Sequence, residues 1–199
     1  MASSQTAIYN MAIGMVGGTR VNSPVGDSVE LNVLNEIWPV ALDDVIAGRD
    51  WSFARKVALL NPVPDPLILL GQNRACFAVP SDSMALRQIS DSTDFDPDNL
   101  HEWEIQEQVV IVESSPGAAL WAKYTKNLRE PAFFDGPFIS CLVARLAAEL
   151  ALPITNSKST FELLWNLYVQ RLNKSTTHNG MQGTRIKLAK GKLSRAHGR

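Results

Sequence analysis

Apolar residues recur at helical spacing in two stretches near the start of the chain. The first predicts a helix over about residues 4–16, opened by a Ser or Thr cap and closed by the pair Gly17-Gly18. Its expected apolar face consists of Ile8, Met11, Ala12, Met15 and Val16. The sequence therefore begins with a short amphipathic helix.

The second stretch predicts a longer helix capped by Asp27 or Ser28 and ended by Gly48. Pro39 falls inside this pattern, and a proline ring removes a backbone donor, so we expect a kink or an interruption there. The apolar stripe of this helix consists of Leu31, Leu34, Ile37, Trp38, Ala41, Leu42 and Val45.

Two more helices are predicted after residue 134. One spans about 135–151, with Asp135 as its cap, Pro137 in its first turn and Pro153 at its end. Its apolar face is broad (Phe138, Ile139, Leu142, Val143, Leu146, Ala147 and Leu150), and an i,i+4 pair, Arg145 and Glu149, is expected on the opposite side. The other helix spans about 160–177, with Ser159 and Glu162 as a capping box and an apolar face of Phe161, Leu164, Trp165, Tyr168 and Leu172.

The pattern changes between about 66 and 126. Short β-type runs such as "ACFAV", "MALRQI" and "VVIVES" alternate there with turn-forming segments, after a proline-rich stretch that cannot be one helix. We expect antiparallel hairpins in a single inserted sheet. The predicted class is α+β, mainly α: a four-helix bundle (1–60 and 131–180) with an inserted antiparallel β-sheet (about 66–126) and an extended C-terminal arm.

Charge separates this body from the arm. Residues 1–184 hold 20 acidic and 13 basic residues, a net charge of −7, whereas residues 185–199 hold six basic residues and no acid. A basic terminal block is typical of proteins that bind a polyanion or an acidic protein surface. The arm, 181–199, is therefore a predicted docking element through Arg185, Lys187, Lys190, Lys192, Arg195 and Arg199.

Few residue patterns in the sequence indicate a catalytic, metal or cofactor site. Glu102 and Glu104 are two residues apart on an expected strand, so their side chains should share a face, where a solvated surface pair is the simpler interpretation. His101, His178 and His197 are scattered, and neither a phosphate-binding loop nor a nucleophile elbow occurs. We therefore predict no catalytic residues, no metal site and no cofactor.

Cysteine content and hydropathy indicate in which cellular compartment the protein is expected. Cys76 and Cys141 lie far apart in apolar runs, which favours buried, reduced thiols over a disulfide framework. No cationic segment precedes an apolar one at the start, and we expect no apolar run to approach the roughly 18 residues that span a bilayer. Neither secretion nor membrane insertion is predicted.

The order of motifs over most of residues 5–175 resembles the tail tubular protein A family of short-tailed bacteriophages, which are head-to-tail adaptor (connector) proteins. The motifs are "AIYNMAIGMVG", "RDWSFARKVALL", "FAVPSDSMALRQI" as a hairpin, "WEIQEQVVIVES", "LWAKYT" and "FISCLVARLAAELALPITNSKSTFELLWNLY". Each motif alone is weak, but their order and spacing, together with the final "LAAELALPITNS", are fairly specific. Pro39 departs from the family pattern, and no motif past residue 180 matches it.

The resemblance implies a structural virion protein without catalytic residues. It would form a ring of twelve copies at the head-tail junction, made in the host cytoplasm. The ring would dock under the portal protein, pass viral DNA through its bore without specific binding during ejection, and receive the tail nozzle protein. An acidic body suits such a channel, because each Lys or Arg that contacts a DNA phosphate would increase the affinity for DNA and hold it in place.

Two other functions remain open from the residues. The basic tail could bind nucleic acid regardless of sequence, since it lacks interleaved aromatic residues and any recognition motif. A tail-associated cell-wall hydrolase acting through Glu102 or another acid is the lesser alternative, because no carboxylate has an environment, identifiable from the sequence, that would raise its pKa.

Overall fold

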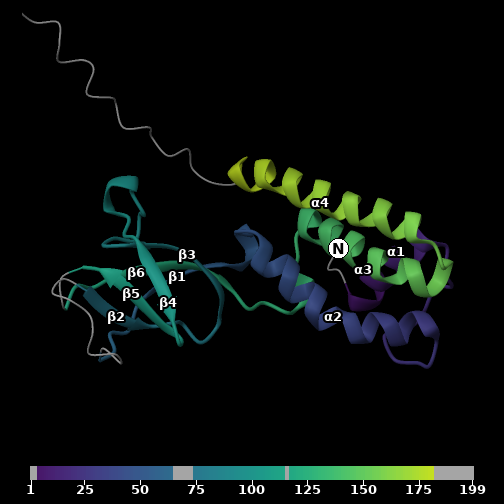
Figure 1. Ribbon diagram of the computed structural model, residues 1–199, viewed down its shortest axis with the longest axis horizontal. Coiled ribbons are helices and arrows are strands. Elements are labelled where there is room, and N and C mark those ends of the chain that lie inside the picture. Colours follow the sequence, from purple (N-terminus) through teal and green to yellow (C-terminus); the bar gives the residue numbers. More distant parts are fainter. Residues whose placement is uncertain (1–3, 65–73, 115–116, 182–199) are drawn as a thin grey trace, which may run out of the picture.

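The computed structural model describes residues 4–64, 74–114 and 117–181, with side chains to residue 175. This part of the chain has an α+β fold with four α-helices and two small three-stranded antiparallel sheets (Figure 1). The helices lie together at one end of the molecule and the strands at the other. In sequence, all six strands fall between the second and third helices.

Helices α1 and α2 form where the apolar spacing predicted them. Helix α1 (Gln5–Val16) begins after Ser4, whose Oγ accepts a hydrogen bond from the N–H of Ala7 (3.2 Å), and ends at Gly17 in the left-handed conformation (φ 73°). Helix α2 (Val29–Gly48) begins after Ser28. Met11, predicted on the inner face of α1, is instead 44% exposed, while Tyr9 and Ile13 are fully buried.

Pro39 does not interrupt α2, which continues through it to Gly48. Pro39 lies on an exposed position, where water can satisfy the carbonyl that loses its helical donor. On the inner side, Leu34, Ala41 and Leu42 are at most 1% exposed. Packing of that side therefore holds the helix together across the missing hydrogen bond.

Helix α3 (Gly136–Thr155) is the central element of the helical half, and α1, α2 and α4 all pack against it. Asp135 caps it as predicted, accepting from the N–H of Phe138 (2.8 Å). The predicted end at Pro153 is wrong: the helix runs on to Thr155 and closes at Asn156 in the left-handed conformation (φ 50°). Pro153 lacks the N–H that would donate to the carbonyl of Glu149, so a proline in the last turn removes one helical hydrogen bond without ending the helix.

The expectation that no apolar stretch is long enough to span a bilayer is also wrong, because α3 meets that criterion by length and composition. Eleven of its residues are buried within the protein, including Leu142, Leu146 and Leu150 at 0% exposure. Its apolarity is accounted for by burial on several sides at once.

Helix α4 (Lys158–Met181) runs beside α3 (Figure 1). Its cap is Ser157 and not the predicted Ser159: Ser157 Oγ accepts from the N–H of Thr160 (3.2 Å), and Ser157 O accepts from the N–H of Phe161 (3.2 Å). Both serines stand shortly before the apolar residues of α4, so the sequence pattern alone does not show which of the two is the cap.

The helical half has one large core with an aromatic cluster at its sheet-facing end. The Phe138 ring lies 4.6 Å from Phe134, 5.0 Å from Phe53 and 5.1 Å from Trp51, measured between centroids. Trp51 is fully buried, and its indole N–H donates to the carbonyl of Val45 (2.7 Å). This cluster fixes the corner where the chain leaves α2 for the strands.

The strands form two sheets and not the single sheet that the sequence predicted. One has the order β1-β6-β3 and the other β2-β5-β4. Strand β1 lies within the segment assigned to the helical bundle and was not predicted as a strand. The bounds are β1 Arg55–Leu59, β2 Arg74–Ala78, β3 Ser83–Ser90, β4 Trp103–Gln106, β5 Val109–Glu113 and β6 Trp121–Lys126.

Only one of the expected hairpins exists among these strands. β4 and β5 pair through the two-residue turn Glu107-Gln108, but the proposed hairpin of β2 with β3 is wrong, because these strands belong to different sheets. The two sheets share a second, smaller core of ten buried residues: Leu60, Ala75, Phe77, Leu86, Ile89, Val110, Val112, Leu120, Ala122 and Tyr124.

Arg87 on β3 joins the two halves of the molecule. Its guanidinium donates to the carbonyls of Ala47 (2.8 Å) and Arg49 (2.7 Å) at the end of α2, and to Thr125 Oγ1 on β6 (2.9 Å). Partial burial lowers the pKa of Arg87, although a guanidinium stays charged at any physiological pH. One side chain thus ties the last turn of α2 to the first sheet.

Candidate functional site

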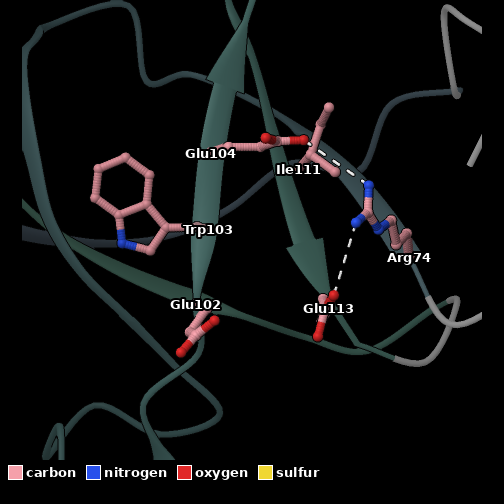
Figure 2. Close-up of a pocket in the computed structure, with 6 residues that line it drawn as sticks. All are labelled: Arg74, Glu102, Trp103, Glu104, Ile111 and Glu113. Carbon is pink, nitrogen blue, oxygen red and sulfur yellow. Dashed lines mark ion pairs between the residues drawn. The ribbon is translucent and has the colours of Figure 1, made fainter.

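A shallow depression of about 190 Å³ lies on one face of the β2-β5-β4 sheet (Figure 2). The strand register brings its charged groups together, since Arg74 on β2 is opposite Glu113 on β5, and Glu104 on β4 is opposite Ile111. Arg74 lies between two carboxylates, 3.9 Å from Glu104 and 3.7 Å from Glu113. The residues that line the depression are Arg74, Glu102, Trp103, Glu104, Ile111 and Glu113.

The predicted pair of acids is partly reproduced. Glu104 lies on β4, Glu102 precedes that strand by one residue, and both line the depression. Sequence reasoning missed Arg74 and Glu113, because they come from other strands and only the register places them there. The hydrolase function through Glu102 stays a prediction, and in this structure the neighbouring Glu104 is paired with Arg74.

The ion pairs at this depression are weak. The three side chains that form them are 42% to 71% exposed, and such solvated pairs contribute about 0–1 kcal/mol to stability. Three carboxylates and one guanidinium line the depression, so it is acidic on balance. Its chemistry favours a cationic group bound at the protein surface.

The acidic character extends along the chain next to the depression. Residues 91–107 contain seven acids and no Lys or Arg. Within this segment His101 Nε2 lies 2.8 Å from Asp91 Oδ1, and Asp96 caps a short 3-10 turn at Pro97–Asn99. We call residues 91–107 the acidic segment.

A second candidate surface follows the outer side of α4. Leu163 is 66% exposed on the side of α4 that is turned away from α3, and the half-buried Leu167 lies one turn further along the same side. A broad open depression of about 490 Å³ lies on this surface, lined by Ser159, Glu162, Leu163, Asn166, Leu167 and Gln170. Exposed apolar side chains grouped on one helix are typical of a protein-protein contact.

The sequence predicted Arg145 on the solvent side of α3, and this prediction is wrong. The i,i+4 ion pair with Glu149 is present, but Arg145 is 8% exposed and its guanidinium also lies 3.4 Å from Asp44 on α2 and over the ring of Trp165 on α4 (4.8 Å). Stacking on an aromatic ring compensates for the lost hydration of a guanidinium. The residue therefore links three helices.

The two cysteines are buried and unoxidised, as the sequence predicted. Burial raises the pKa of the Cys141 thiol to about 11, which makes it a poor nucleophile. In residues 4–64, 74–114 and 117–181 the structure contains no group of three or more His, Cys, Asp or Glu side chains that could hold a metal ion. The absence of a cofactor stays a prediction.

The six predicted arm residues, Arg185, Lys187, Lys190, Lys192, Arg195 and Arg199, lie outside the described residues. Comparison with protein-family models gives no match, and comparison with curated proteins finds no significant relative.

Proposed function

We propose that this protein is a head-to-tail adaptor of a short-tailed bacteriophage, a structural subunit that joins the portal to the tail nozzle. The observation that carries the proposal is the order of the sequence motifs that resemble the tail tubular protein A family. The first and last of these motifs fall in α1 and in α3 with α4, the elements that pack together in the helical core. The resemblance thus involves residues that determine the fold.

Ring formation by identical copies is supported by the outer side of α4. An adaptor ring needs a heterologous contact, in which one surface of each copy binds a different surface of the next. Leu163 and the neighbouring Leu167 supply apolar area that such a contact would bury. A ring of twelve copies is part of the proposal.

Passage of DNA is supported by the charge of the body. The net charge of −7 over residues 1–184 disfavours adhesion of a duplex, which carries a dense negative charge. Attachment to the portal is assigned to the basic arm, whose six cations would bind an acidic portal surface. Localisation in the virion follows from these two assignments.

Negative-stain electron microscopy of the full chain, alone and mixed with portals purified from virions, tests the proposal. Closed rings that stack coaxially on portals are expected. Monomers under both conditions would contradict it. Tight binding of free duplex by the monomer in a filter assay, lost at moderate salt, would favour the nucleic-acid-binding alternative.

The arm assignment has its own test. Deletion of residues 183–199 should leave the helical and sheet halves folded, as followed by circular dichroism, and abolish joining to portals. A full-length control with the six Lys and Arg replaced by Gln keeps the length of the arm and removes its charge. Normal attachment by both variants would refute the role of the arm.

A further inference from the structure

The β2-β5-β4 sheet has two different edges. The edge at β2 is covered by the chain that precedes it: the N–H of Val63 donates to the carbonyl of Cys76, and the N–H of Ala78 donates to the carbonyl of Asn61, both at 2.9 Å. At the other edge, β4 pairs with β5 alone among the described residues. Alternate residues of β4 therefore direct N–H and C=O groups away from the sheet.

The side chains of β4 differ between its two faces. Trp103 packs against the small core, and Ile105, two residues further along the strand, lies on the same face but is 47% exposed. Glu104, with Glu102 just before the strand, lies on the opposite face at the acidic depression (Figure 2). A strand that completed this edge would need apolar residues on one face and cations on the other.

One stretch of the same sequence has this alternation. Residues 185–188 read Arg-Ile-Lys-Leu, so in an extended conformation Arg185 and Lys187 would share one face and Ile186 and Leu188 the other. Each face matches the corresponding face of β4, with cations beside Glu102 and Glu104, and apolar side chains beside Trp103 and Ile105.

We propose that residues 185–188 of a second copy add to the open edge of β4 as a further antiparallel or parallel strand. Backbone hydrogen bonds would supply affinity, and the two matched faces would fix the register. The second copy rests on the proposed adaptor function, since a contact from the arm of one copy to the sheet of the next is heterologous, the kind of contact from which a closed ring is built. The other four cations of the arm would then be the ones that bind the portal protein: Lys190, Lys192, Arg195 and Arg199.

Other occupants of this edge fit less well. In the symmetric antiparallel registers centred on residues 102, 103 or 104, two β4 edges would place Glu102 or Glu104 opposite an acid of the other copy, which is destabilising. The edge strand β1 carries two cations, but Arg55 already binds Asp50 (2.9 Å) and Lys56 already binds Asp82 (2.8 Å) within the chain. The cations of residues 185–188 make a better complement to the edge.

Disulfide cross-linking of full-length chains tests the proposal. One protein carries Glu104→Cys, and a second, differently tagged protein carries one cysteine at position 185, 186, 187 or 188. Paired strand positions have Cα atoms about 4.5–5.5 Å apart, within reach of a disulfide. Because neighbours alternate between faces, cysteines at 185 and 187 should cross-link at least about fivefold more than those at 186 and 188.

Controls separate strand addition from nonspecific association. Glu36→Cys, an exposed acid on α2, should give no cross-link with any of the four positions. Equal yields at all four positions would overturn the proposal in favour of loose charge attraction. Glu104→Cys and Lys187→Cys in a single chain should give a ladder of oligomers; an internally bridged monomer would overturn the assignment to a second copy.

The outcome is distinguishable from that of the proposed function. Rings seen by electron microscopy without the alternating cross-links would overturn this contact and leave the adaptor function standing. Alternating cross-links in open chains that never close into rings would support the contact and contradict the adaptor function.

Discussion

The helical half and the sheet half of this protein bury apolar surface on different scales. Among the residues that the structure describes, the helical core contains 26 buried residues and includes α3, which is buried on several sides, whereas the core between the sheets contains ten. Buried apolar area is the main favourable term in folding, so the helical half should dominate the stability of the chain. The sheet half depends more on hydrogen bonds, register and its attachment to α2.

The largest expected effect on stability comes from a comparison of two buried phenylalanines, one in each half. Phe138→Ala should destabilise the protein by about 3–5 kcal/mol, because the side chain is fully buried and packs against three aromatic rings. Phe77→Ala in the sheet core should cost less, because fewer buried groups surround it. Urea unfolding followed by circular dichroism measures both. An equal or larger loss for Phe77→Ala would contradict the comparison, and Phe138→Leu is the conservative control.

The next test concerns Arg145, the charged residue inside the helical half. Arg145→Ala should cost about 2–4 kcal/mol, since it removes the stack on Trp165 and both ion pairs from a buried site. Arg145→Met keeps the aliphatic stem and should cost less. Trp165 is one of five tryptophans, so the difference in fluorescence between chains with Trp165 and with Trp165→Phe, followed in urea, reports whether α4 separates from α3. Equal losses for the Met and Ala variants would show that charge, and not packing of the stem, determines the stability of this site.

A smaller effect is expected from the tie between the halves. Arg87→Met should cost about 1–3 kcal/mol, because it leaves the carbonyls of Ala47 and Arg49 and the hydroxyl of Thr125 without this donor. Scanning calorimetry should then show separate transitions for the two halves. The control Arg74→Met removes an exposed arginine of the sheet and should change stability by less than about 1 kcal/mol. A single unshifted transition in Arg87→Met would refute its linking role.

Sequence patterns predicted the helical half well because helices depend on local residues. The Ser4, Ser28 and Asp135 caps and the periodic apolar faces lie within a few residues of the backbone groups that they satisfy. The errors at Pro39 and Pro153 have a common cause: tertiary packing offsets the loss of one hydrogen bond at each proline, and sequence periodicity does not measure that packing.

Sheet pairing was predicted poorly because it depends on distant residues. Strand β1 pairs with β6, more than sixty residues later, and only one of its five residues is even half-buried, so it lacks the alternation that marks a strand. The candidate site shows the same limit. Glu102 and Glu104 were predicted to share a face from their spacing, but the ion pairs of Arg74 arise from the register of three strands.

The smallest predicted effect lies in the turn between β4 and β5. Glu107 and Gln108 both have positive φ (46° and 70°), which glycine adopts at little cost and other residues do not. Gln108→Gly should therefore stabilise the sheet half by about 0.5–1 kcal/mol. In the Arg87→Met background, the gain should appear only in the transition assigned to the sheets, as followed by amide exchange of β4 and β5. Gln106→Gly, one residue before the turn and within β4, is the matched control and should destabilise. A loss of stability in Gln108→Gly would mean that contacts of the glutamine side chain outweigh the strain of its backbone, and that the turn helps to hold the sheet half together.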